Sequence, residues 1–135
     1  MDLVQKAYTL ALTARENAYA PYSHFRVGAA FKLKDSDQII TGCNVENASF
    51  GATICAERGI IMKSFADYGK AEFDFAVVVT KDDPPAPPCA LCLQVLAEFC
   101  GPDFPIHIAD LEGIKKTLCL KELIPHSFTA FTPEE

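Results

Sequence analysis

Apolar positions near the start of the chain recur every three or four residues, which is the spacing of one face of a helix. This pattern runs from Asp2 to about Tyr19, and Asp2 is a residue type that caps helix N-termini. The segments from Cys55 to about Tyr68 and from Leu91 to Cys100 have the same spacing, and a glycine follows each of them. The pattern therefore predicts three helices.

Short apolar runs lie between and after these helices, bounded by turn-forming residues such as those at positions 35–37. They predict strands at Val27 to Leu33, Gln38 to Thr41, Phe73 to Thr80, Ile106 to Ala109 and Ile114 to Leu118. Because a hairpin joins the first two strands whereas helices join others, the sheet should be mixed. We expect an α/β fold of three layers, α/β/α, with a mixed β-sheet of about five strands, in a single domain over residues 1–135.

Composition and charge narrow the class of protein. Half of the 135 residues are hydrophobic and 22% are charged, which is the balance of a packed globular protein. The net charge of -6, with scattered Lys and Arg, would repel a phosphate backbone and disfavours a nucleic-acid partner. Polar residues interrupt the segment from Met1 to Leu12, so it lacks the apolar run of a signal peptide or a membrane span. We expect a cytoplasmic protein without a membrane partner.

The chain has six cysteines, and a disulfide framework is disfavoured because cytoplasmic thiols are kept reduced. Cys43, Cys100 and Cys119 stand alone in apolar or turn contexts. We interpret these three as small core side chains without a chemical role. The other three cysteines are candidate metal ligands.

Cys89 and Cys92 lie three residues apart at the start of a predicted helix, directly after two prolines, so both sulfurs can face one point. Cys55 also begins a predicted helix, whose dipole and free N–H groups stabilise a thiolate. Three thiolates without an obvious fourth ligand are typical of catalytic zinc, which keeps one position for water. Three other interpretations stay open: a redox dithiol of Cys89 and Cys92, two unrelated buried thiols at these positions, and a structural zinc site closed by His24 or Cys43.

Two charged residues that follow Cys55 fit a catalytic zinc site. Arg58, one turn along the predicted helix, can donate hydrogen bonds to the thiolate sulfurs and offset their negative charge. Glu57 is close enough to reach a water molecule at the metal without being an obvious ligand, so we predict that it is the proton shuttle. The alternatives are a solvated surface arginine and an exposed glutamate favoured by the helix dipole.

Two segments of the chain together resemble the small, homotetrameric cytidine deaminases: Cys55-Ala56-Glu57-Arg58 and Pro88-Cys89-Ala90-Leu91-Cys92-Leu93-Gln94. The signature of zinc deaminases combines metal-binding cysteines with a glutamate that is not a ligand. The resemblance continues through residues 20–23, 25–30, 42–48 and 123–125, so it covers nearly the whole chain. It implies zinc-dependent hydrolytic deamination of cytidine and deoxycytidine to uridine and deoxyuridine, with release of ammonia, in pyrimidine salvage.

The same resemblance implies substrate-binding roles. Asn44 and Glu46 would bind the ribose hydroxyls, Phe25 would line the base pocket, and the backbone N–H of Ala56 would contact the pyrimidine carbonyl. A polar pair beside a turn also makes independent sense as sugar recognition, with plain turn-forming residues as the alternative. In a homotetramer, contacts from neighbouring subunits would complete the site, and the residues implied for them are Ala48, Phe50 and Phe128. Simple core packing is the alternative role for an aromatic residue such as Phe128.

The chain departs from the family pattern at Ala90, Leu91 and Leu93, where the family usually has Gly, a small residue and Arg. Ala90 would be strained if the backbone there had a positive φ, but it is harmless in a helix. Leu93 removes a positive charge beside a ligand and leaves Arg58 a larger share of the charge compensation. We expect these changes to affect substrate range and rate more than zinc binding.

Overall fold

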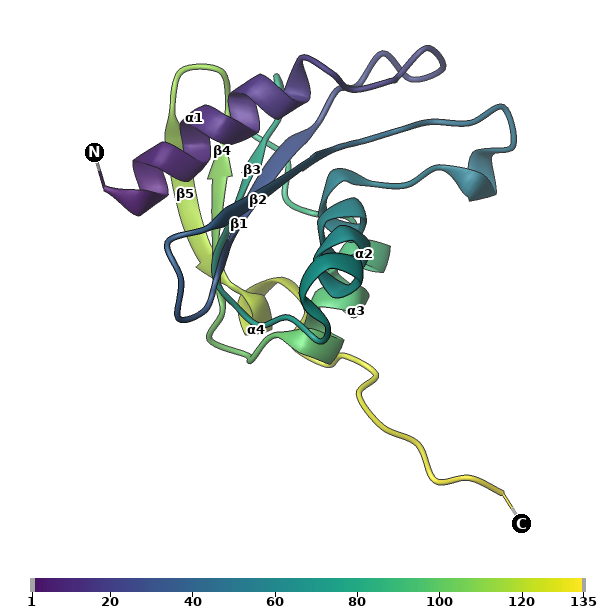
Figure 1. Ribbon diagram of the computed structural model, residues 1–135. Coiled ribbons are helices and arrows are strands. Elements are labelled where there is room, and N and C mark those ends of the chain that lie inside the picture. Colours follow the sequence, from purple (N-terminus) through teal and green to yellow (C-terminus); the bar gives the residue numbers. More distant parts are fainter. Residues whose placement is uncertain (1, 135) are drawn as a thin grey trace.

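A computed structural model describes residues 2–134 of the chain (Figure 1). Its elements follow the predicted order α-β-β-α-β-α-β-β, with two short additions. The strands are β1 (Gly28–Leu33), β2 (Ile39–Cys43), β3 (Phe73–Val79), β4 (Pro105–Ala109) and β5 (Ile114–Cys119). The helices are α1 (Leu3–Arg15), α2 (Ala56–Tyr68), α3 (Ala90–Phe99) and the short α4 (Leu120–Leu123), together with the 3-10 turn η1 (Phe50–Ala52).

The five strands form one mixed sheet in the order β2-β1-β3-β4-β5. β3 and β4 are parallel, because α3 carries the chain back to the starting edge before β4 begins. The other neighbouring pairs are antiparallel. The prediction of a mixed sheet of about five strands is confirmed.

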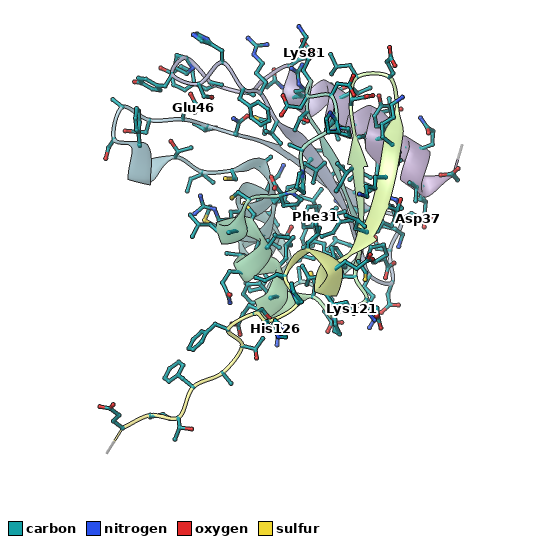
Figure 2. All side chains as sticks on the ribbon, turned by 180° about the vertical axis from the view of Figure 1, so that it is seen from behind. Phe31, Asp37, Glu46, Lys81, Lys121 and His126 are labelled. Carbon is teal, nitrogen blue, oxygen red and sulfur yellow. The ribbon has the colours of Figure 1, made fainter. Side chains whose placement is uncertain are left out.

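Helices cover both faces of this sheet (Figure 1). α1 packs on one face through Ala7 and Ala11, which are fully buried. The opposite face packs against α2 and α3 around Phe31, which is also fully buried. Figure 2 shows Phe31 in the middle of the molecule. The predicted three-layer α/β/α arrangement is therefore confirmed.

Two strand glycines let the helices approach the sheet closely. A Cβ atom on Gly28 would lie 2.1 Å from the carbonyl oxygen of Ala11 in α1, and one on Gly42 would lie 2.7 Å from the carbonyl oxygen of Ala56 in α2. Neither distance leaves room for a side chain. The contact at Gly42 holds the first residue of α2 against β2, which places this helix N-terminus beside the sheet.

The first helix is shorter than its hydrophobic pattern predicts. The prediction extends to about Tyr19, whereas α1 ends at Arg15 with Glu16 as its C-cap. The backbone N–H of Tyr19 instead donates to the carbonyl of Asn44 at 3.0 Å, and the carbonyl of Tyr19 accepts from the N–H of Glu46 at 2.8 Å. This pairing with a distant segment competes with helix continuation, and a local pattern cannot reveal it.

The other boundaries differ from the prediction by one or two residues. Cys55 is the N-cap of α2 rather than its first residue, and α3 begins at Ala90 after the N-cap Cys89. The cap of α1 is as predicted, because the Asp2 carboxylate accepts from the backbone N–H of Gln5 at 2.8 Å. η1 and α4 were not predicted, because three or four residues are too few to show a helical period.

None of the helices within residues 2–134 is long and apolar enough to cross a membrane.

Candidate metal centre

Three thiols converge where α2 and α3 begin. The Cys55 and Cys89 sulfurs lie 3.8 Å apart, the Cys89 and Cys92 sulfurs lie 3.6 Å apart, and all three sulfurs lie within 4.8 Å of one another. Cys55 and Cys89 are the N-caps of their helices, so each side chain leaves an extended residue directly in front of a helix N-terminus. The structure thus brings together the three cysteines that the sequence analysis proposed as ligands.

Long-range backbone contacts set the position of Cys55. The preceding residue, Ile54, pairs with Val45 through two backbone hydrogen bonds of 2.9 and 3.0 Å. Because Val45 follows β2 closely, this pairing ties the start of α2 to the edge strand of the sheet.

A proline-rich loop from the end of β3 delivers Cys89. Residues 84–88 contain four prolines, so Ala86 offers the sole backbone N–H of this stretch. That N–H donates to the side-chain oxygen of Thr80 at 3.3 Å. Thr80 is almost fully buried at the end of β3, so it anchors the loop next to the sheet.

The pKa values of the thiols indicate that this cluster can bind a cation. Hydrogen bonding with Cys92, helped by Arg58, lowers the pKa of Cys55 to about 5. The Cys55 thiolate and burial in turn raise the pKa of Cys92 above its ordinary value of 9.0. The three thiols cannot all be ionised at neutral pH unless a bound cation offsets their negative charge.

Zinc fits this cluster. Zinc–sulfur bonds of about 2.3 Å in tetrahedral geometry place neighbouring sulfurs roughly 3.8 Å apart, and the sulfur separations given above already agree with that spacing. Zinc also supplies the positive charge that three thiolates need. No ligand needs to move far to bind the metal.

Arg58 supplies positive charge from the first turn of α2. Its Nη2 atom donates to the Cys55 sulfur at 3.7 Å and to the carbonyl oxygen of Thr53 at 3.1 Å. Its Nε atom is buried and has no hydrogen-bond partner within residues 2–134. The guanidinium is therefore held against the thiol cluster rather than in solvent, which argues against the surface alternative.

Glu57 is buried next to the thiols, with 4% of its surface exposed. Burial raises the pKa of its carboxyl from 4.5 to about 7. A carboxyl that titrates near neutral pH suits a general acid and base, because both protonation states are accessible in one catalytic cycle. The alternative of an exposed helix-terminal glutamate is wrong, since this side chain is enclosed.

A cavity of about 280 Å³ opens beside the thiols and Glu57. Six residues predicted for the site line it: Phe25, Asn44, Glu46, Cys55, Glu57 and Cys89. Its other lining residues were not predicted as site residues: Ser23, Val27, Thr53, Val78, Thr80, Ala86 and Pro87. Apart from Ser23 and Val27, which lie in segments that resemble the deaminases, nothing in the local sequence around them points to a site, because the fold alone brings them together.

Four predicted substrate-binding residues do not line this cavity, and of these only Ala56 lies beside the thiols, between Cys55 and Glu57 at the start of α2. The other three lie farther away. Ala48 is exposed, and Phe50 is 76% exposed in η1, with its ring centroid 5.9 Å from that of Tyr22. Phe128 is 65% exposed on the C-terminal segment, which extends away from the body of the molecule (Figure 1). Within one chain the structure does not bring these three residues to the thiol cluster.

The departures from the deaminase pattern are accommodated in α3. Ala90 is the first helical residue, and it is not among the non-glycine residues of positive φ in the described chain, which are His24 and Asp35. Leu93 is 7% exposed and belongs to the hydrophobic core. Leu91 is 64% exposed at the helix N-terminus. Ala90 is thus unstrained, and Leu93 contributes to packing instead of charge.

The remaining cysteines are less buried than predicted. Cys43, Cys100 and Cys119 are all partly exposed. Cys100 packs against the hydrophobic core, as predicted, whereas Cys43 and Cys119 do not, so the interpretation as core side chains is wrong for these two. Each lies at or directly after the end of a strand or helix. Among the described residues, the cluster of possible metal ligands at this site contains neither Cys43 nor His24, which leaves the closed structural-zinc interpretation without its fourth ligand.

Comparisons with known proteins agree with this geometry. Residues 1–108 match the family model described as the cytidine and deoxycytidylate deaminase zinc-binding region. The chain is 43% identical over 120 residues to a cytidine deaminase of Halalkalibacterium halodurans, covering 89% of each chain. It is 39% identical over 126 residues to that of Sporosarcina psychrophila, covering 93% of this chain and 91% of the relative.

Solved structures give the same result. The crystal structure of cytidine deaminase from Burkholderia pseudomallei is similar with a TM-score of 0.84 and 37% identity, covering 92% of this chain and 98% of that one. The structure of cytidine deaminase from Mycobacterium tuberculosis is similar with a TM-score of 0.78 and 32% identity, covering 94% and 98%.

Proposed function

This chain belongs to the cytidine and deoxycytidylate deaminase family, and on that premise we propose that it deaminates free cytidine and deoxycytidine to uridine and deoxyuridine. One observation carries the proposal: the buried carboxyl of Glu57 borders one cavity together with Cys55 and Cys89, two of the three clustered thiols. In the overall reaction water replaces the amino group at C4 of the cytosine ring, and ammonia leaves. The enzyme is a zinc-dependent hydrolase.

Cys55, Cys89 and Cys92 are the proposed zinc ligands. Zinc, when bound there, is a Lewis acid that makes water reactive near neutral pH. Arg58 offsets part of the thiolate charge through its hydrogen bond to Cys55, so that the electrophilic character of the site is preserved.

Glu57 is the proposed proton shuttle. It accepts one proton from the attacking water and transfers it to the neighbouring ring nitrogen. It then takes the second proton from the new hydroxyl group at C4 and delivers it to the amino group, so that the C4–N bond breaks, the C4 carbonyl forms and ammonia leaves. The carboxyl is enclosed, and burial raises its pKa to about 7 in the metal-free protein, which supports a role that uses both protonation states.

Residues of the cavity wall and of the N-terminus of α2 are proposed to bind the nucleoside. Phe25 lines the base pocket, Asn44 and Glu46 bind sugar hydroxyls, and the backbone N–H of Ala56 binds the pyrimidine carbonyl. The first three border the same cavity as Glu57, which supports this assignment. Ala56 lies between Cys55 and Glu57 at the N-terminus of α2, where backbone N–H groups are free to donate.

We place the enzyme in pyrimidine salvage in the cytoplasm, acting as one catalytic domain over residues 1–135. Salvage reuses free nucleosides, which are the substrates proposed for this enzyme. The net charge of -6 supports a nucleoside over a polynucleotide.

We also propose a homotetramer in which neighbouring subunits contribute Ala48, Phe50 and Phe128 to each site. The exposure of Phe50 and Phe128 supports this arrangement, as does the extended C-terminal segment (Figure 1). Phe128 stacks on Phe131, itself 75% exposed, at a centroid distance of 6.2 Å. Two exposed aromatic rings on one extended segment leave apolar surface in contact with water in an isolated chain, and such surface is typical of a protein interface.

Replacing Phe128 with Ala should therefore raise KM for cytidine about fivefold, the equivalent of roughly 1 kcal/mol of lost aromatic stacking. Sedimentation equilibrium of the wild type should give about four times the chain mass of 14.7 kDa. Tyr68→Ala is the matched control. It also removes an exposed aromatic side chain, but from the C-terminal end of α2, the end opposite the thiol cluster. A monomeric wild type, or an unchanged KM in Phe128→Ala, would contradict the assignment of Phe128.

The ultraviolet absorbance of cytidine and deoxycytidine, incubated with purified protein of measured zinc content, tests the proposed function. We expect the absorbance of both nucleosides to fall, with about one zinc per chain. Zinc without turnover would favour a different substrate or a structural metal. Little metal together with a reversible Cys89–Cys92 disulfide would favour the redox interpretation.

A further inference from the structure

The loop between α1 and β1 is tied to the sugar side of the cavity through one carboxylate. The Oε1 atom of Glu46 accepts hydrogen bonds from the backbone N–H groups of Tyr22 at 3.0 Å and Ser23 at 3.1 Å. The Oε2 atom of Glu46 accepts a hydrogen bond from the hydroxyl of Ser23. These bonds lower the pKa of Glu46, with the Ser23 hydroxyl as the largest cause, so this side chain is a carboxylate. Figure 2 shows Glu46 among the loops that project beyond the sheet.

The same serine hydroxyl also fixes the backbone of Phe25. The side-chain oxygen of Ser23 accepts from the N–H of Phe25 at 3.0 Å, and the carbonyl of Phe25 accepts from the Asn44 side-chain amide at 2.8 Å. The intervening residue, His24, has φ of 59°, which is unusual for a residue with a side chain. Both polar backbone groups of Phe25 are therefore held by side chains of the cavity wall.

The number of acceptor positions on Glu46 then limits what else it can bind. An ionised carboxylate has about four lone-pair sites. The loop occupies two on Oε1 and one on Oε2. One acceptor position is left, on Oε2, and Ser23 sets its direction because it occupies the other position on that oxygen.

We propose that Ser23 is a positioning residue that aims the remaining acceptor of Glu46 at one sugar hydroxyl while it holds Phe25 at the base. This inference rests on the proposed deamination of nucleosides. It assigns Ser23 no contact with reacting atoms. Ser23, Phe25 and Glu46 border the same cavity, so the three side chains act on one bound molecule.

Ser23→Ala tests this role because it removes the hydroxyl from both contacts. We expect KM for cytidine to rise about tenfold while kcat changes less than threefold, since a misdirected charged acceptor weakens binding of the sugar rather than the chemical step. The kcat/KM preference for cytidine over its 2′-deoxy or 3′-deoxy analogue, whichever the wild type disfavours, should fall by a similar factor. A purely structural defect would lower activity on all three nucleosides alike.

The chain contains a matched control in the β1–β2 hairpin. The side-chain oxygen of Ser36 accepts from the N–H of Gln38 at 3.0 Å, the same contact to the N–H two residues on that Ser23 makes, and the preceding residue, Asp35, also has φ of 59°. Ser36 lies outside the cavity. Ser36→Ala should therefore keep the wild-type KM and preference, and Ser23→Thr, which keeps a hydroxyl, should restore most of both.

The wild type must be measured first, by turnover of cytidine and by calorimetric binding of uridine to the zinc-loaded protein. A wild type that does neither overturns the proposed function and this role with it. An active wild type whose sugar preference is unchanged in Ser23→Ala overturns the role of Ser23 alone. Equal losses in Ser23→Ala and Ser36→Ala also overturn it, because the effect would then belong to the turn.

Discussion

Replacing Glu57 with Gln should give a folded protein that keeps its zinc and deaminates cytidine at least a thousandfold more slowly. Gln has nearly the same shape and fits the enclosed position, but its amide cannot accept and return a proton. The cysteine ligands are untouched, so metal binding is preserved. Single-turnover rates, zinc content by elemental analysis and the circular dichroism spectrum measure these three properties. Near wild-type turnover in this variant would refute the assignment of Glu57 as the proton shuttle.

The same variant should show the cost of burying this carboxyl. Because the pKa of Glu57 is raised to about 7 in the folded metal-free protein, folding binds a proton that the unfolded chain releases near pH 4.5. Binding of this proton stabilises the folded state relative to the unfolded chain. This contribution to the free energy of unfolding is fully present below about pH 4.5 and is lost as the pH rises through about 7. Metal-free Glu57→Gln should therefore be more stable than metal-free wild type above pH 7, and the difference should vanish below pH 4.5. Thermal denaturation across this pH range measures both limits.

Replacing Cys89 with Ala should abolish zinc retention and reduce deamination to background. Cys89 stands between the other two sulfurs, at 3.8 Å from Cys55 and 3.6 Å from Cys92, so its loss leaves two ligands and no tetrahedral set. Its side chain is exposed, and its removal therefore opens no cavity in the core. Zinc content after dialysis and turnover of cytidine measure the two effects.

Cys43→Ala is the matched control for this experiment. Cys43 is a partly exposed free thiol at the end of β2, and it was a candidate fourth ligand in the structural-zinc interpretation. We expect this variant to keep zinc and activity. Loss of zinc from Cys43→Ala would revive the closed structural site, whereas full zinc content in Cys89→Ala would show that the metal binds elsewhere.

The largest error in the predicted secondary structure has a specific cause. The apolar spacing continues through Ala18, yet α1 ends at Arg15 because Tyr19 pairs with the segment around Val45. The helix boundary is decided by hydrogen bonds to residues more than twenty positions away.

The amino-acid sequence alone predicts the layer architecture of this protein and the three cysteines that cluster in the structure. Local information suffices for these features, because apolar periodicity selects helix or strand and Cys55 and Cys89 directly precede helix-forming segments as their N-caps. The convergence of the sulfurs depends in addition on the long-range contacts of Ile54 and Thr80. The tertiary structure alone decided the burial of Glu57, the anchoring of the proline loop by Thr80, and the link from Ser23 to Glu46. These features depend on how the sheet brings distant segments together, and the desolvation and hydrogen bonds that follow have no counterpart in any short stretch of chain.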